Sequence, residues 1–451
     1  MRLSNNEEEK SMKKRLMSTV LCTSLAASML CCVGVQAEEN QKFENPVKLT
    51  YLTWQYADRT PSTDAWIEGC KEKFNIEIEL QNTPNDNYEA MFLTKFAADD
   101  LPDLVSVHKV APDYKTEGGA QIDENTFVDI SDLENIGNFS EDTLEGVKID
   151  GKLYYVPVAQ NALGVLYNKK VFEENGLEIP TDIDEFMSVM NTLKDNGVTP
   201  LAGSFSEVWS AQIIPFIAWD NYVGRKDPEA AQKLYDCRTD KSSLRWTGLE
   251  GAEETFALTK KWVDEGYFTE EPLSTDASVA CQLLATGDAA MFITGSWEYS
   301  VAAEACDDGV EIGFFPLPLN ENGEELYVPS TAVEGMCINA KSENVEAAQI
   351  AMNYYLSQEI QQLVTDDLNG IATHKEVSLG AFASEVRDAV NNNKRMFPSL
   401  YTKSCGYTIP ADSTLYTGIA QEFQNILIGK ITPAELCEKL DETTAEVAIV
   451  E

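Results

Sequence analysis

Histidine is scarce in this sequence, which contains only two among 451 residues, His108 and His374. So few imidazoles leave little material for a Ser/His/Asp or Cys/His catalytic site. The sequence also has no HExxH zinc motif, no Walker glycine loop and no GxGxxG after a predicted strand. We therefore expect no enzymatic activity, no cofactor and no metal ion. A glycosidase needs only two carboxylates, so an extracellular glycosidase is the enzymatic alternative that inspection leaves open.

Basic residues are also few. Lys and Arg together number 34 against 75 Asp and Glu, which gives a formal net charge of −41. Binding to nucleic acid needs a basic stripe that displaces the counterions of the phosphates, and this sequence has none. A nucleic-acid partner is therefore excluded. An acidic surface is more typical of a soluble protein that resists association than of a site for cationic ligands.

A long uncharged apolar run occurs only near the N-terminus, at residues 16–35. It follows the basic Met12-Lys13-Lys14-Arg15 and precedes the small-residue pattern Val35-Gln36-Ala37, which is typical of a cleaved secretory signal peptide. We expect residues 1–37 to be this leader, with Met12 as an alternative start, and the mature chain to lie outside the cytoplasm, secreted or at the cell surface. A lipid anchor on Cys31 or Cys32 is an alternative, although the residues before them depart from a lipobox.

Close pairs of cysteines are absent from the rest of the sequence. An odd number of widely scattered cysteines is typical neither of a disulfide framework nor of a zinc site. Most are expected to be small buried apolar residues. The seven that follow the expected leader are Cys70, Cys237, Cys281, Cys306, Cys337, Cys405 and Cys437.

Strand-length apolar runs alternate with helical patterns in the first part of the mature chain. Strands are predicted over residues 47–53, 76–80 and 104–107, with a helix ending near Asn75 and another over residues 88–98. This β-α-β-α-β order implies a mostly parallel sheet with helices on its faces. Ligands bind at the carboxyl ends of such strands, so the loops after residues 53 and 107 are candidate site segments.

Residues 151–169 contain two strand-length apolar runs, 153–156 and 164–167, around a short connection with Pro157, Gln160 and Asn161. A connector this apolar predicts a chain that passes directly from one compact unit into another. The length of 451 residues is enough for two such units. A cleft between two lobes is a common place for a small ligand.

Residues 285–297 predict a helix end, a glycine turn, a strand, a second glycine turn and a helix start. This segment and residues 151–169 resemble a known family. The sequences Gly151-Lys152-Leu153-Tyr154-Tyr155-Val156-Pro157, Tyr167-Asn168-Lys169 and Gly287-Asp288-Ala289-Ala290-Met291, with Gly295-Ser296-Trp297, are similar to motifs of the extracellular solute-binding proteins of sugar-importing ABC systems, the family of maltose-binding protein. The resemblance runs from Val47 to about Glu446.

The resemblance implies a two-lobed α/β fold of the periplasmic-binding-protein type (type II). Each lobe is expected to be a mostly parallel sheet flanked by helices, with a hinge between the lobes. Lobe 1 would comprise residues 38–157 with about 326–370, and lobe 2 residues 158–318 with about 375–451. The hinge crossings are expected near residues 157–162, 316–328 and 370–376.

The resemblance also implies a function, which is capture of a mono- or oligosaccharide in the cleft between the lobes. The expected protein is a monomer without a cofactor, and it delivers its ligand to the membrane permease subunits of an ABC transporter. One alternative is the same fold with a polyamine, a peptide or a phosphorylated polyol as ligand. A polyamine would need several carboxylates in the cleft. A phosphate would need a cationic pocket, and Arg59 alone is weak evidence for one.

A sugar presents C–H-rich faces and a rim of hydroxyls, so its site needs aromatic platforms and multidentate polar groups. Trp297 is the strongest candidate platform, since the resemblance places it in the cleft against a sugar ring. Asn161 matches the junction position that carries a sugar-binding carboxylate in maltose-binding protein. The other candidates also fit packing, a cap or a solvated loop, and they are Trp54, Tyr56, Asp58, Arg59, Asp103, His108, Glu207, Trp209, Glu334 and Tyr416.

Overall fold

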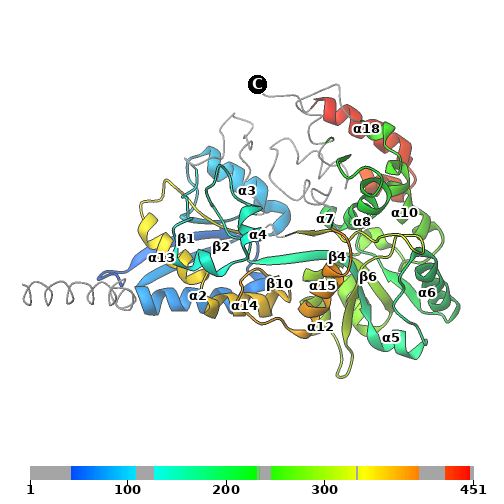
Figure 1. Cartoon of the computed structure of the whole chain (residues 1–451), viewed down its shortest axis with the longest axis horizontal. Helices are drawn as coiled ribbons and strands as arrows, with labels where there is room; N and C mark the ends of the chain where they lie inside the picture. Colours follow the sequence, from blue (N-terminus) through cyan, green and yellow to red (C-terminus); the bar gives the residue numbers. More distant parts are fainter. Residues whose placement is uncertain are drawn as a thin grey trace, which may run out of the picture.

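The computed structural model describes residues 42–107, 126–230, 233, 245–331, 334–395 and 422–446. In these ranges the chain forms two separate β-sheets, each flanked by helices. Figure 1 shows the two sheets next to each other, with the long strand β4 (Ala159–Asn168) extending between them. A search of the same ranges finds no helix with the length and hydropathy that a membrane span requires.

The first sheet has the strand order β2-β1-β3-β9. Strand β1 (Val47–Thr53) is parallel to β2 (Ile76–Asn82) and to β3 (Leu104–Val107), as predicted, and β9 (Gly335–Ile338) runs antiparallel to β3. The helical segments of this half are η1 (Ala57–Arg59), α2 (Thr60–Gly69), η2 (Cys70–Phe74), α3 (Asn85–Ala97), η3 (Glu134–Asn138), α4 (Glu141–Glu145), α13 (Val345–Tyr355) and α14 (Gln358–Leu368).

The second sheet has the order β10-β4-β6-β5, and two further strands pair with β4. Its other strands are β5 (Thr199–Ala202), β6 (Ala289–Gly295), β7 (Ile312–Phe315), β8 (Ser330–Thr331) and β10 (Ile371–Ala372). The helical segments of this half are α5 (Lys169–Glu174), α6 (Ile183–Asp195), α7 (Val208–Ala211), α8 (Ile213–Trp219), η4 (Asp220–Gly224), η5 (Trp246–Gly248), α10 (Ala252–Asp264), η6 (Pro272–Ser274), α11 (Ala277–Thr286), η7 (Ser296–Glu298), α12 (Tyr299–Glu304), α15 (Ala381–Asn391) and α18 (Pro433–Glu446).

The prediction of a mostly parallel sheet is wrong for the second half. Strand β4 is antiparallel to all the strands that pair with it, and only β5 and β6 are parallel. All residues of β6 are buried, which is typical of a central strand covered on both faces. A strand buried on both faces has the same apolar pattern in either direction, so periodicity cannot report strand direction here.

The start of β4 is the place where the chain passes between the two halves. Strand β8 pairs with Asn161 and Ala162, and β10 pairs with Ala159 and Gln160. The predicted short connection between strand-length runs at 153–156 and 164–167 is therefore wrong in detail, because β4 includes Gln160 and Asn161, whereas residues 153–156 form no strand. The sequence pattern of residues 331–338 predicts one strand, and this is also wrong, since β8 pairs with β4 and β9 with β3. The exact lobe boundaries remain a prediction.

Local sequence signals set several helix boundaries as predicted. Thr432 and Glu435 form a capping box at the start of α18, with the Glu435 amide 3.2 Å from Thr432 Oγ1 and the Thr432 amide 2.7 Å from Glu435 Oε2. Gly287 has a φ of 81° and ends α11, in the left-handed region that glycine adopts without strain. The sequence pattern of residues 204–219 predicts one helix, but the structure has two, α7 and α8, which are separated at Gln212.

Candidate functional site

A cavity of about 600 Å³ lies between the two halves of the protein. The first half contributes the residues that follow β1, the η1 turn, Glu334 before β9 and the C-terminal end of α14. The second half contributes α7, α8 and the η7–α12 segment, and the start of β4 lies between them. The cavity thus lies at the carboxyl end of β1, where the strand-end rule predicts a ligand site.

Two indole rings form the aromatic wall of the second half. Trp297 follows β6 in η7, and its ring lies 6.2 Å from that of Trp209 on α7, at an interplanar angle of 55°. The absence of a side chain on Gly295 leaves room for the indole of Trp297, because a Cβ on residue 295 would lie closer than 3.0 Å to this ring. Both tryptophans are partly buried against the core of this half, which holds the rings in place while each leaves a part exposed.

A third indole ring comes from the first half. Trp54 directly follows β1 and packs against Tyr88 of α3, with 4.6 Å between the ring centroids and an interplanar angle of 64°. Tyr88 is buried, and its hydroxyl donates to the Ser106 carbonyl at 2.6 Å. The aromatic surface of the cavity therefore comes from two separate sheets.

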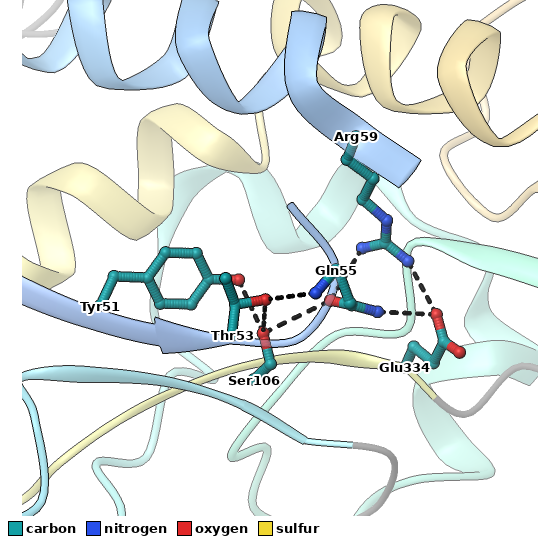
Figure 2. Close-up of polar contacts among 6 residues, drawn as sticks. All are labelled: Tyr51, Thr53, Gln55, Arg59, Ser106 and Glu334. Carbon is teal, nitrogen blue, oxygen red and sulfur yellow. Dashed lines mark hydrogen bonds and ion pairs between the residues drawn. The ribbon is translucent and has the colours of Figure 1, made fainter. Parts of the chain in front are cut away.

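Arg59 and Glu334 form an ion pair in the cavity wall, with 2.8 Å between Nη2 and Oε2. Gln55 Nε2 donates to the same Oε2 at 2.7 Å, and Arg59 Nη1 donates to Gln55 Oε1 at 3.2 Å (Figure 2). The exposed fraction of Arg59 is only 4%. Pairing with Glu334 offsets the cost of removing this guanidinium from water, so the three side chains fix one another.

The same network extends into the first sheet (Figure 2). Ser106 Oγ on β3 lies 2.7 Å from the Tyr51 hydroxyl and 2.8 Å from Thr53 Oγ1, and the Gln55 amide donates to Thr53 Oγ1 at 3.0 Å. Burial raises the pKa of Tyr51 to about 12, so its hydroxyl stays neutral and hydrogen-bonded. The end of β1 is thereby tied to β3, which makes the first-half wall rigid before any ligand binds.

Two amide side chains in the wall have buried atoms without a hydrogen-bond partner in the described part of the chain. Gln212 is completely buried, and both its Oε1 and its Nε2 lack a partner there. Asn161 on β4 is 8% exposed, and its Oδ1 also lacks one. A buried polar atom left unpaired costs about 1–3 kcal/mol. These atoms are therefore candidates for hydrogen bonds to a ligand or to bound water.

Carboxylates line the cavity where η7, α12 and the end of α14 meet. Glu298 is 9% exposed, and Cys281 Sγ lies 3.4 Å from its Oε2. Asp367 accepts a hydrogen bond from the Ser62 amide at 2.8 Å, and burial raises the pKa of Asp367 although this bond acts against the shift. Glu304 and Asp366 are exposed at the rim.

The cavity brings together predicted site residues that lie far apart in the sequence. They are Trp54, Arg59, Asn161, Trp209, Trp297 and Glu334. Their role in binding remains a prediction. His108 and Tyr416 fall outside the described residues, as does the side chain of Asp58, whose backbone lies in η1.

Three predicted site residues are not part of the cavity wall that the described residues form. The Tyr56 hydroxyl donates to Asp64 Oδ1 at 3.0 Å, near η1. Asp103 Oδ2 accepts from the Thr50 amide at 2.7 Å, so this carboxylate binds the neighbouring strand β1 and not the turn before its own strand. Glu207 Oε2 accepts from the Ala277 amide at 2.9 Å, where it satisfies a free N–H at the start of α11.

Several lining residues were not predicted from the sequence, among them Gln55, Gln212, Glu298 and Asp367. Gln212 is a lone amide in the otherwise apolar run 211–219, and a polar residue at such a position is a usable signal. Asp367 reaches the cavity only because α14 packs against α2, and this long-range contact leaves no trace in local sequence.

The arrangement suits binding rather than chemistry at a metal. Among the described residues, no group of three or more His, Cys, Asp or Glu side chains is placed to hold a metal ion. The cavity wall contains both flat apolar rings and hydrogen-bonding groups, so it can take a small ligand with apolar faces and a polar rim.

Comparisons with known proteins agree with this geometry. A family model described as bacterial extracellular solute-binding protein matches residues 65–394. The multiple sugar-binding protein of Streptococcus mutans is 23% identical over 318 residues, which cover 70% of this chain and 73% of that protein.

Solved structures share the fold. A chitin oligosaccharide binding protein superposes with a TM-score of 0.74 at 22% identity, over 89% of this chain and 99% of that chain. A sugar transporter from Bacillus licheniformis in complex with stachyose superposes with a TM-score of 0.71 at 17% identity, over 89% of this chain and 100% of that chain. These matches confirm the predicted two-lobed α/β fold, with mixed sheets in place of mostly parallel ones.

Proposed function

The chain belongs to the bacterial extracellular solute-binding proteins, and from this membership we propose that it captures a mono- or oligosaccharide in the cavity between its two halves and delivers it to an ABC importer. The family consists of binding proteins, so the prediction that the chain is not an enzyme is confirmed at the level of the family. Membership also places the protein outside the cytoplasm. Free secretion or a lipid anchor on Cys31 or Cys32 remain alternatives for its final location.

The observation that carries the proposal is a single cavity with aromatic side chains from both halves in its wall. Trp54 belongs to the first half, whereas Trp209 and Trp297 belong to the second. A pyranose ring has apolar C–H faces that pack on indole rings, and its hydroxyls at the edge need multidentate polar groups. Asn161, Gln212 and the ion-paired carboxylate of Glu334 lie around the same space.

Binding would favour a closed arrangement of the halves. A ligand held by Trp54 and Trp297 at once makes its full set of contacts only when both walls are near it, so its binding shifts the population toward closure. The paired strands β4, β8 and β10 are the segments around which such a movement would occur. The closed form is the one that we expect the membrane permease subunits to recognise, with the binding protein acting as a monomer.

Two of the three alternative ligand classes, peptides and polyamines, are compatible with a cavity that carries carboxylates and aromatic rings. The names of the relatives reported above refer to sugars, however, which favours a saccharide for this chain. A glycosidase is disfavoured by the family assignment.

The proposal is tested by titrating the mature protein with raffinose, stachyose and chitin oligosaccharides in a calorimeter. Trp297→Ala should weaken the tightest of these interactions by about thirtyfold or more, as loss of a central aromatic contact does. The melting temperature of the ligand-free protein should change little, because Trp297 is only partly buried.

Phe43→Ala is the matched control. Phe43 is a partly buried aromatic residue, and its amide donates to Phe74 at the start of the first sheet, far from the carboxyl end of β1. This variant should bind the saccharide as the wild type does. Absence of binding to every saccharide would reject the proposed function, and equal affinities of Trp297→Ala and wild type would remove Trp297 from the site.

A further inference from the structure

The charges in the cavity wall are strongly unequal. Among the lining residues that the structure describes, the only cationic side chain is Arg59, and the anionic ones are Glu298, Glu304, Glu334, Asp366 and Asp367. A wall with one guanidinium and five carboxylates carries a net negative charge at neutral pH when these acids are ionised.

The single cation is already engaged by the protein. Arg59 Nη2 lies 2.8 Å from Glu334 Oε2, and Arg59 Nη1 donates to Gln55 at 3.2 Å. Figure 2 shows the guanidinium directed at both of these side chains. Burial raises the pKa of Asp367, and the nearby charge of Arg59 acts against this shift. Arg59 is thus neutralised locally, and an anionic ligand would have to compete with Glu334 for it.

Backbone and aromatic groups add to the negative potential. The 11-residue helix α14 ends at the cavity with Leu368 and Asn369 in the wall, so the negative end of its dipole faces the ligand space. The faces of Trp54 and Trp297 carry the negative part of the aromatic quadrupole, which attracts cations and repels anions. The positive end of α2 also lies in the wall, at Pro61, so it is the excess of carboxylates that sets the sign of the potential.

We propose that the cavity selects its saccharide by charge: it accepts uncharged and cationic amino-sugar units and rejects sugars that carry a carboxylate or a phosphate. This selectivity rests on the proposed saccharide-binding function and names the ligand class within it. It also disfavours the phosphorylated polyol that the sequence left open. Specificity of this kind comes from placing like charge against the wrong ligand, which costs more than a lost contact.

The first experiment is a calorimetric panel on the mature protein. The uncharged probes are raffinose, stachyose and chitotriose, the cationic probe is the glucosamine trimer, and the acidic probes are trigalacturonate and glucuronate-substituted xylotriose. We expect the tightest ligand to be uncharged or cationic, and each acidic probe to bind about tenfold or more weakly. An acidic probe that binds within twofold of the tightest uncharged one overturns the inference and leaves the proposed function intact.

The salt dependence of binding distinguishes rejection of a ligand by charge from rejection by shape. At 0.5 M NaCl the Debye length is shorter than the cavity, so discrimination against the acidic probes should fall severalfold relative to low salt. Discrimination that does not change with salt would mean rejection by shape, and would overturn the inference. If no saccharide of any charge binds, the proposed function itself fails and the inference falls with it.

A second variant tests the role assigned to Arg59. Glu334→Gln keeps the size of the side chain but removes the charge that neutralises the guanidinium, so it should raise the affinity for trigalacturonate about tenfold relative to the uncharged probes. Glu304→Gln removes one negative charge from the exposed rim of the same cavity without uncovering a cation, and should change that ratio at most about threefold. Equal shifts of this affinity ratio in the two variants would show that Glu334 does not neutralise the charge of Arg59.

Discussion

Replacing Gly295 by alanine tests the aromatic wall without removing any aromatic ring. The new Cβ would lie closer than 3.0 Å to the Trp297 indole, whereas ordinary van der Waals contacts begin at 3.4 Å. The backbone of Gly295, with φ −89° and ψ 154°, is suitable for alanine, so the whole conflict falls on the indole. The ring must therefore move by roughly 1 Å or more from its place in the cavity wall.

The magnitude follows from losing the stacking surface. We expect Gly295→Ala to weaken saccharide binding by about 1.5–3 kcal/mol, which is roughly 10- to 150-fold in Kd. The stability of the ligand-free protein should fall by about 1–3 kcal/mol, as for other overpacked positions. Calorimetric titration gives the affinity, and urea unfolding gives the stability.

Two further variants make the result decisive. Gly137→Ala adds the same methyl group in η3, where nothing lies within 4 Å of the added Cβ, and should leave the affinity unchanged. The double variant Gly295→Ala/Trp297→Ala should bind no more weakly than Trp297→Ala, because the clash disappears with the ring. A Kd of Gly295→Ala within twofold of wild type would refute the placement of Trp297 against the ligand.

The remaining predictions concern buried titratable groups. His374 is 3% exposed, its Nδ1 accepts from the Glu376 amide at 3.2 Å, and burial lowers its pKa below the usual 6.5. The folded state therefore favours neutral His374, whose stabilising effect is complete above pH 6.5 and is lost as the pH falls through the lowered value. His374→Gln should flatten the urea stability profile between about pH 7 and 5, and an unchanged profile would contradict this origin. Burial also raises the pKa of the Cys70, Cys281 and Cys337 thiols above the ordinary value of 9.0, so these residues should resist a thiol reagent at pH 8 in the native protein and react in denaturant, as read by peptide mapping. Rapid native labelling of Cys337 would contradict its burial.

The sequence predicted most of the elements of the first half because their signals are local. Strands β1 and β3 have the predicted boundaries, and the capping box of α18 is a pattern of only four residues, Thr432 to Glu435. The strand directions of the second half could not be predicted from the sequence. A strand buried on both faces, such as β6, has the same apolar pattern whether its neighbour is parallel or antiparallel. The sequence did not predict that β4 includes Gln160, since this depends on pairing with β8 and β10, which lie far away in the chain.

The residues of the candidate site also differ in whether the sequence can predict them. Trp297 and Trp54 could be anticipated because each follows a strand at a glycine turn or strand end. Gln55, Glu298 and Asp367 could not, since their place in the wall depends on contacts between distant segments, such as Gln55 with Glu334 and Asp367 with the Ser62 amide. Motifs thus predict the candidate platforms, whereas the polar groups beside them depend on tertiary packing.

Small-angle scattering with and without saturating saccharide tests the central claim most directly, which is that one ligand is held by both halves at once. Using the tightest ligand of the panel, we predict that the radius of gyration decreases on the order of 1 Å and that Trp297→Ala, at the same ligand concentration, shows no such change. Superimposable profiles of the free and the fully saturated wild-type protein would contradict the account.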